Sequence, residues 1–139
     1  MTARTNILPR RYSLKGQIVI TRLMTAGRWQ RCYPLASKWS VIGGAGAGVQ
    51  FVFVARKKMF KHAVDRNRCK RLMREAFRLN AQPLMRLCEE GRLPLKVAVL
   101  YVGQKIEGFT TVEHAAKKSI AQLTAFAQEQ IEQNRQANL

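Results

Sequence analysis

The sequence predicts an α+β domain, with a small mixed sheet of about four strands and three main helices. Its 139 residues fit one compact domain, and 47% of them are apolar, which is enough for a substantial core. Short β-branched and aromatic runs alternate along the chain with segments of helical periodicity. This alternation is typical of helices packed on a sheet.

The domain itself is expected to span residues 14–127. Residues 1–13 are predicted to be a flexible basic arm, and the polar residues 128–139 a tail that frays. No apolar run is long enough for a membrane span. The three cysteines are an odd number without metal-ligand spacing, which indicates free thiols in a reducing compartment and favours a cytoplasmic location.

The first half of the chain predicts one helix followed by two strands. Residues 14–26 show the apolar spacing of a short helix that ends before a glycine. Residues 31–42 and 49–55 are rich in β-branched and aromatic residues, which favours strands. We expect the glycine-rich residues 43–48 to be a hairpin loop that joins them.

The second half predicts a helix over residues 66–80, capped by Asp65. A short helical piece follows, and then the apolar run 95–102 favours a buried strand. Residues 110–113 fit a capping box, so they should open a last helix that extends to about residue 127.

Positive charge is concentrated in the first part of the chain. The net charge is +17, and residues 1–80 hold 18 Lys and Arg against two acids. Residues 81–139 hold seven Lys and Arg against six acids. Such a one-sided field indicates a polyanionic partner. Nucleic acid is favoured because lysine and arginine release counterions from phosphates, and an anionic membrane surface is the rival interpretation.

The predicted helix over residues 66–80 separates two faces. One is apolar and should pack on the core: Cys69, Leu72, Met73, Ala76 and Phe77. The other carries four cations and an amide: Asn67, Lys70, Arg71, Arg74 and Arg78. Arginine forks match phosphate oxygens and stack on bases, so this face predicts nucleic-acid binding. No helix-turn-helix, zinc spacing or heptad seam is present, which favours folded RNA over DNA.

Residues 57–78 also carry a specific order of short motifs. It runs Lys57-Lys58, Ala63-Val64, Arg66-Asn67-Arg68, Lys70-Arg71, Arg74-Glu75 and Phe77-Arg78. This order closely resembles the signature of the bacterial ribonuclease P protein component family, and the similarity covers about residues 10–126.

The resemblance implies a left-handed βαβ crossover and an accessory subunit of an endoribonuclease. In this family a catalytic RNA removes the 5′ leader of precursor tRNA, and the protein supplies no catalytic residue. The implied partners are the ribonuclease P RNA and precursor tRNA, with neither DNA nor membrane. Mg²⁺ would be held by the RNA subunit and the substrate, and no metal by protein side chains.

The resemblance also implies two sets of contact residues. A cleft between the first helix and the sheet would hold the leader, where Ile20 and Met24 stand at positions commonly occupied by Phe. Trp39 is either a substitute stacking platform in that cleft or a core residue. The RNA-binding set comprises Lys57, Lys58, Lys61, Arg66, Asn67, Arg68, Lys70, Arg71, Arg74 and Arg78.

Two other functions remain open from the residues alone. Charge and periodicity fit a ribosomal-type architectural RNA-binding protein equally well, and only the Arg-Asn-Arg motif distinguishes the two. A self-sufficient nuclease is opposed by the scattering of the eight acids, because a two-metal site needs clustered carboxylates.

Overall fold

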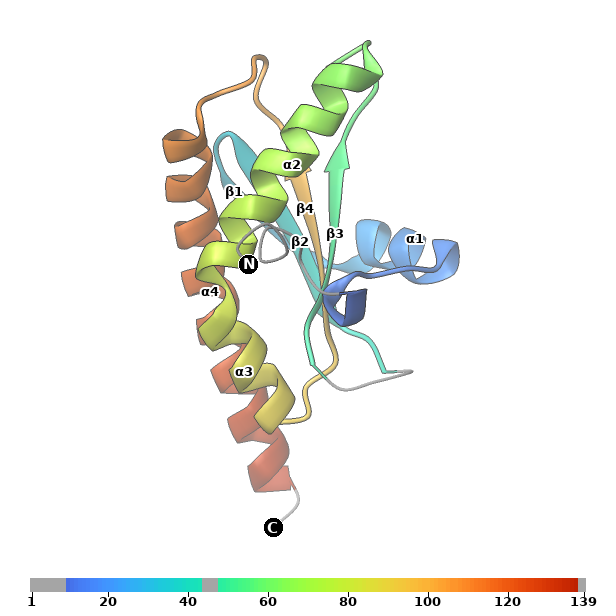
Figure 1. Ribbon diagram of the computed structural model, residues 1–139. Coiled ribbons are helices and arrows are strands. Elements are labelled where there is room, and N and C mark those ends of the chain that lie inside the picture. The colour runs from blue at the N-terminus through green and yellow to red at the C-terminus, as the bar shows by residue number, and fades with distance from the viewer. Residues whose placement is uncertain (1–9, 44–47, 138–139) are drawn as a thin grey trace.

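The computed structural model describes residues 10–43 and 48–137. Over these ranges it has the predicted α+β architecture, with a four-stranded mixed sheet and four α-helices (Figure 1). The elements in chain order are a short 3-10 helix η2 (Arg10–Tyr12), α1 (Gln17–Ala26), β1 (Arg28–Cys32), β2 (Leu35–Val41), β3 (Gln50–Ala55), α2 (Ala63–Asn80), α3 (Gln82–Glu90), β4 (Leu95–Tyr101) and α4 (Phe109–Ala137).

The strands lie in the order β1-β2-β4-β3. β1 pairs antiparallel with β2, and β2 with β4, whereas β3 and β4 are parallel neighbours. α2 and α3 therefore form a crossover between β3 and β4. In Figure 1 both strands point up the page, α2 passes in front of them, and β4 lies to the left of β3. The crossover is thus left-handed, as expected from the resemblance and against the usual preference.

The predicted hairpin between residues 42 and 49 is wrong. Residues 44–47 lie outside the described part of the chain, but the strands on either side, β2 and β3, are separated by β4. All seven residues of β4 are buried, so this strand takes a central position with a partner on each edge. The actual hairpin joins β1 and β2 at Tyr33-Pro34, where the sequence predicted one continuous strand.

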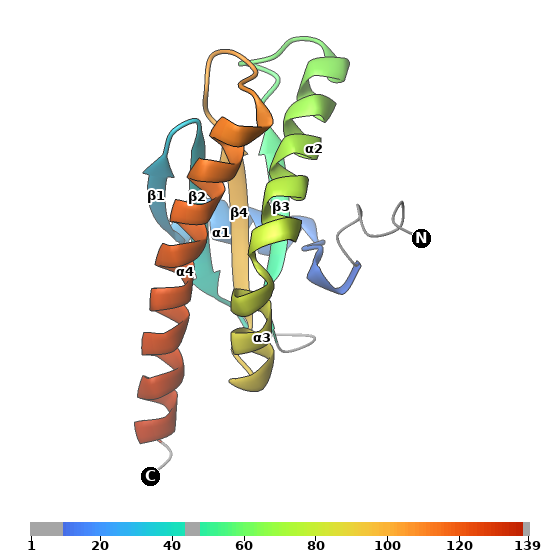
Figure 2. The same cartoon turned by 60° about the vertical axis from the view of Figure 1, so that its left-hand side comes forward.

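Three helices cover one face of the sheet. α2, α3 and α4 lie on the viewer's side in Figure 2, and together with the sheet they enclose the main core. At its centre the ring of Phe77 lies 5.4 Å from that of Phe51 and 5.7 Å from that of Phe53. Edge and tilted ring contacts of this kind strengthen a core beyond the area that they bury.

The opposite face of the sheet is covered by α1 alone, which lies behind the sheet in Figure 2. A smaller cluster of buried residues joins α1 to this face: Leu14, Leu23, Ile42, Ala98 and Leu100. Val52 and Val54 of β3 are only half-buried against it. This face therefore keeps part of its apolar surface accessible.

The ends of the domain differ from the prediction. α4 continues to Ala137, beyond the expected end at residue 127, and Ile131 packs against the main core. A Cβ on Gly91 would come within 2.7 Å of two Ile131 side-chain atoms, so any larger residue there would displace the Ile131 side chain. The polar composition of residues 128–137 suggested fraying, but a helix that is already formed extends at little cost.

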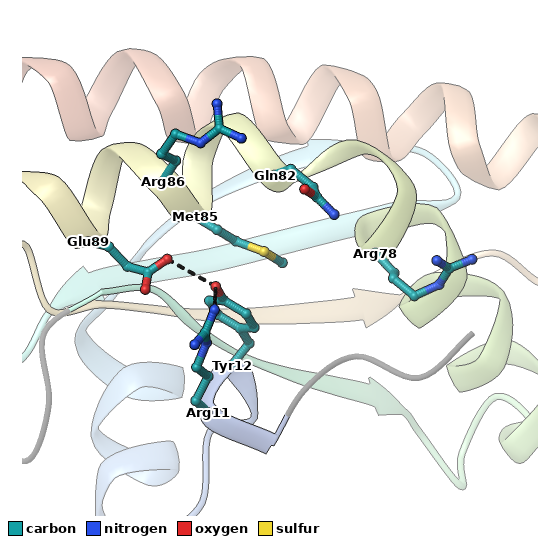
Figure 3. A pocket seen from close by; sticks show the side chains of 7 residues that line it. All are labelled: Arg11, Tyr12, Arg78, Gln82, Met85, Arg86 and Glu89. Atoms are coloured by element: carbon teal, nitrogen blue, oxygen red, sulfur yellow. Dashed lines mark hydrogen bonds between the residues drawn. The ribbon is translucent and has the colours of Figure 1, made fainter. Parts of the chain in front are cut away.

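Residues 10–13 belong to the folded body, whereas residues 1–9 of the expected arm lie outside the described part. The Tyr12 side chain is buried, and Leu14 N–H donates to the Phe51 carbonyl at 2.7 Å. Tyr12 Oη accepts a hydrogen bond from Arg11 and donates one to Glu89 Oε1 of α3 at 3.0 Å. Figure 3 shows this chain of polar contacts inside a pocket of about 280 Å³. It fastens the start of the domain to α3.

Both predicted helix caps are absent from the described structure. α2 begins at Ala63, so Asp65 lies within its first turn, and no described side chain caps it. α4 begins at Phe109, and Glu113 instead accepts a hydrogen bond from Asn80 Nδ2 at 3.0 Å. Cys32, Cys69 and Cys88 are free and buried. No helix in the described part is long and apolar enough to cross a membrane.

Candidate nucleic-acid interface

α2 presents its apolar face to the core as the periodicity predicts. Cys69, Met73, Ala76 and Phe77 are buried, and Leu72 is half-buried against the same cluster. Packing therefore fixes the rotation of α2 about its own axis. The residues on the other side of the helix must point outward.

Asn67, Arg68, Arg71 and Arg74 lie exposed on that outer side, and we call these four residues the α2 basic surface. Lys70 is half-buried at its margin. Positions three apart on a helix are neighbours, with a rise of about 4.5 Å between them, so the guanidinium groups follow one another along the surface. The ion pairs among described residues involve Arg78 and Arg135, and none involves these three arginines.

Arg78 differs from the other arginines of α2. It forms a two-pronged ion pair with Glu75, in which Arg78 Nε lies 3.2 Å from Glu75 Oε2 and Nη2 contacts Oε1. These hydrogen bonds raise the pKa of Arg78. Its guanidinium is therefore committed to a carboxylate of the same helix, although periodicity placed it on the cationic face.

Arg66 turns toward the body of the protein. Its Nη1 donates to the carbonyl oxygens of Phe60 and Lys61, both at 2.8 Å. The Phe60 ring in turn packs edge-on against Tyr101 at 5.7 Å. Arg66 thus fixes the segment 56–62 against the start of α2.

The same segment carries the other predicted cations. Lys57, Lys58 and Lys61 are all exposed on it. The lysines therefore lie in the connection that leads into α2, and Arg66 holds the end of this connection through the carbonyls of Phe60 and Lys61.

The structure separates the three residues predicted for the leader cleft. Ile20 and Met24 are half-buried where α1 packs on the sheet. Trp39 lies in the main core on the opposite face, 7% exposed, with its ring 6.0 Å from Phe126. Alternate residues of a strand point to opposite faces, which puts Trp39 out of reach of α1. Trp39 is therefore a core residue and not part of a cleft with Ile20 and Met24.

Several residues on the α1 face were missed by the sequence analysis. Trp29 of β1 is 59% exposed and lies opposite Lys38 of β2, whose Nζ donates to the Met24 carbonyl at 2.7 Å. Arg31 shares this face, and its guanidinium lies 5.6 Å from the Tyr33 ring centre. Alternate residues of the segment 28–32 point to the same face, and this pattern would have placed Trp29 beside Arg31. It was missed because the predicted strand began only at residue 31.

No group of three or more His, Cys, Asp or Glu that could hold a metal ion occurs in the described ranges. The candidate interface therefore consists of cations, amides and aromatic rings. These side chains bind phosphates by ion pairing and bases by stacking.

The family model described as Ribonuclease P matches residues 8–124. The chain belongs to the ribonuclease P family. The match includes both surfaces described above and ends before the last turns of α4.

Curated relatives in this family carry the name ribonuclease P protein component. The protein from Chlorobium phaeobacteroides is 53% identical over 60 residues, covering 40% of this chain and 41% of the relative. The Porphyromonas gingivalis protein is 42% identical over 67 residues, covering 48% and 49%. The Chlorobaculum tepidum protein is 39% identical over 87 residues, covering 60% and 56%. The chain thus spans about half the length of the curated relatives it matches.

Among solved structures, the RNase P protein of Staphylococcus aureus superposes with a TM-score of 0.61. The alignment covers 81% of this chain and 97% of the other, at 17% sequence identity. At this identity the likeness shows the ribonuclease P protein fold alone.

Proposed function

We propose that this chain is the protein subunit of ribonuclease P, which binds the catalytic RNA and the 5′ leader of precursor tRNA to support 5′-end maturation of tRNA. The observation that carries the proposal is the α2 basic surface. Its three arginines are exposed, without carboxylate partners among the described residues, on a helix held rigidly by its apolar face.

The α2 basic surface docks on the RNA subunit in this proposal. Arginine forks pair with phosphate oxygens, and Asn67 can donate to and accept from a base edge or a 2′-hydroxyl. Lys57, Lys58 and Lys61 extend the contact, because Arg66 holds their segment beside α2. Lys70 adds a positive charge at the edge of the α2 basic surface. Arg78 contributes less because Glu75 already binds it.

The leader lies on the α1 face in this proposal. Ile20 and Met24 supply apolar contact there, and Trp29 supplies an exposed ring on the same face of the sheet. Stacking on an aromatic ring is worth roughly 1–3 kcal/mol per base and tolerates any sequence. These residues suit a single strand whose bases are unpaired.

Cleavage belongs to the RNA subunit in this proposal. Mg²⁺ is held by RNA and substrate phosphates, and the protein reduces the repulsion between two polyanions. No protein side chain acts as a nucleophile or metal ligand. The role places the protein in the cytoplasm, with precursor tRNA as substrate.

Reconstitution tests the proposal. The full chain is added to a ribonuclease P RNA at a Mg²⁺ concentration too low for the RNA alone, and release of the leader is followed. We expect cleavage only when protein and RNA are both present. Cleavage by the protein after rigorous removal of RNA would contradict the assignment. RNA binding without faster cleavage would instead support an architectural RNA-binding protein.

A matched pair of variants tests the docking surface. Arg71→Gln/Arg74→Gln removes two charges from α2, and Lys117→Gln/Lys118→Gln removes two from exposed positions on α4. We expect the α2 variant to weaken binding to the RNA subunit at least about tenfold, and the α4 variant to change it less than about threefold. Equal losses would mean that only total charge matters.

A further inference from the structure

A pocket of about 460 Å³ is lined by residues of α2 and by the first residue of α4, two helices that lie side by side in Figure 2. Its walls are Arg71, Leu72, Glu75 and Phe109. The volume is within the range of about 300–1,000 Å³ that is usual for small-molecule sites. Arg71 belongs to the α2 basic surface, so the pocket adjoins the surface that docks on RNA in the proposed function.

Two apolar side chains line the pocket without being fully covered. Leu72 and Phe109 are half-buried and pack against the border of the main core. The Phe109 ring contacts no other aromatic ring within the described part of the chain. Both side chains therefore keep apolar surface that a ligand in the pocket would cover.

The two charged groups of the pocket differ in what already binds them. Arg71 and Glu75 are about one turn apart on α2, with a rise of about 6 Å between them. Arg71 is exposed and has no hydrogen-bond, ion-pair or ring partner among the described residues. Glu75 binds Arg78 with both carboxylate oxygens. A carboxylate has about four lone-pair sites, so Glu75 keeps acceptor positions for a ligand.

These groups favour an unpaired nucleobase over a phosphate. A phosphate would meet the negative charge of Glu75 and two apolar walls, and both oppose its binding. A base is uncharged and flat, and unpaired RNA bases are recognised by stacking on aromatic rings or arginine planes and by hydrogen bonds to their edges. Phe109 and Arg71 supply the stacking partners, and Glu75 supplies acceptors for a base edge that carries donors.

We propose that the pocket between α2 and α4 receives one unpaired guanine of the RNA subunit. Guanine presents two donors side by side, N1–H and the N2 amino group, which match the acceptors of a carboxylate. Adenine and cytosine present an amino group beside a ring acceptor, and uracil presents N3–H between two carbonyls, so each places an acceptor against Glu75. The guanine contact rests on the proposed function, because it adds a base to the docking of α2 on RNA.

Kethoxal modification of the RNA subunit tests the pocket, because this reagent reacts with N1 and N2 of unpaired guanines. The RNA is modified alone and when saturated with the full chain, and the modified positions are read by primer extension. We expect one guanine whose reaction falls at least about tenfold when wild-type protein binds. Absence of any guanine protected in this way would overturn the proposal, and this measurement needs no variant.

A matched pair of phenylalanine variants assigns the protected guanine to the pocket. Phe109→Leu removes the ring and keeps an apolar side chain. Phe126→Leu makes the same change at another half-buried phenylalanine of α4 that packs against the main core. With the RNA still saturated, we expect Phe109→Leu to raise the kethoxal reaction at least about fivefold and Phe126→Leu to protect as wild type does. Unchanged protection in Phe109→Leu, or equal loss in both variants, would overturn the assignment.

Replacement of the protected guanine by adenine tests recognition of the base without altering the protein. We expect wild-type protein to bind the adenine-containing RNA at least about fivefold more weakly, and Glu75→Gln to distinguish the two RNAs less than about twofold. The ratio is measured because Glu75→Gln also releases Arg78, which changes the affinity for any RNA. Equal binding of both RNAs by wild-type protein would overturn the guanine assignment.

The reconstitution assay separates the guanine pocket from the proposed function. A protein that stimulates cleavage, but protects no guanine through Phe109, removes the pocket and leaves the proposed function intact. A protein that neither binds the RNA subunit nor stimulates cleavage overturns both.

Discussion

The two faces of the sheet use the same strands but differ in what covers them. One face lies under α2, α3 and α4 and forms a continuous core that includes Phe51, Phe53 and Phe77. The other lies under α1 alone and combines a small apolar cluster with Lys38, Lys96 and the exposed Trp29. The difference teaches that most of the core lies on one face, whereas the other face keeps Trp29 exposed. In the proposed function, the α1 face contacts the leader and the outer side of α2 docks on the RNA subunit.

Truncation of a buried side chain should give the largest difference in stability between the two faces. Phe77→Ala leaves a cavity beside the rings of Phe51 and Phe53, and we expect it to lower the free energy of unfolding by about 3–5 kcal/mol. Ile20→Ala, on the half-buried α1 face, should cost about 1–2 kcal/mol. Urea denaturation measures both. Similar losses would show that the α1 face is as much a core as the other.

Removal of Trp29 should affect RNA binding more than stability. Trp29→Ala is expected to weaken binding of a single-stranded leader about five- to one-hundred-fold, because one stacked base is lost. The free energy of unfolding should change by less than about 0.5 kcal/mol, since the ring is mostly exposed. Leu79→Ala, at an exposed apolar position on α2, is the control and should leave leader affinity unchanged.

Lys38 should stabilise the end of α1. Its ammonium donates to the Met24 carbonyl, one of the last carbonyls of that helix, and such contacts contribute about 1 kcal/mol. Lys38→Met is expected to speed amide hydrogen exchange in the last turn of α1 and leave α2 unchanged. Unaltered protection of α1 would show that this hydrogen bond contributes nothing.

The smallest expected effect concerns the buried cysteines, whose thiols should hardly react in the native protein. Burial raises the pKa of Cys69 to about 11 and that of Cys88 to about 12, so the thiolate is scarce at pH 8. We expect negligible alkylation of Cys69 and Cys88 by iodoacetamide in the native protein, and full alkylation of both in urea, as measured by peptide mass spectrometry. A cysteine introduced on the other face by Trp29→Cys should react without urea, and its protection would contradict the exposure of that face.

Local patterns predicted the four α-helices, β3, β4 and the orientation of α2, but not the division of residues 28–41 into β1 and β2. The apolar spacing of Cys69, Met73 and Phe77 settles which side of the helix is buried, and so which arginines point outward. The run 95–102 likewise indicated a buried strand. Properties that repeat within one element, such as periodicity and charge, were therefore readable from the sequence.

Long-range partners were not predictable in the same way. The placement of β4 between β2 and β3 depends on contacts between segments far apart in the chain. Trp39 and Trp29 look alike in sequence, and only strand pairing shows that one is core and the other exposed. The inward turn of Arg66 and the pairing of Arg78 with Glu75 depend on side-chain conformations that periodicity does not specify.

The central place of β4 also sets an order of events during synthesis. β4 is the last strand to be made, yet β2 and β3 meet only through it. The sheet therefore cannot close until the nascent chain has emerged from the ribosome as far as Tyr101. Until then the cationic helix α2 lacks the complete sheet on which it packs, and a chain interrupted before that point cannot join β3 to the β1–β2 hairpin.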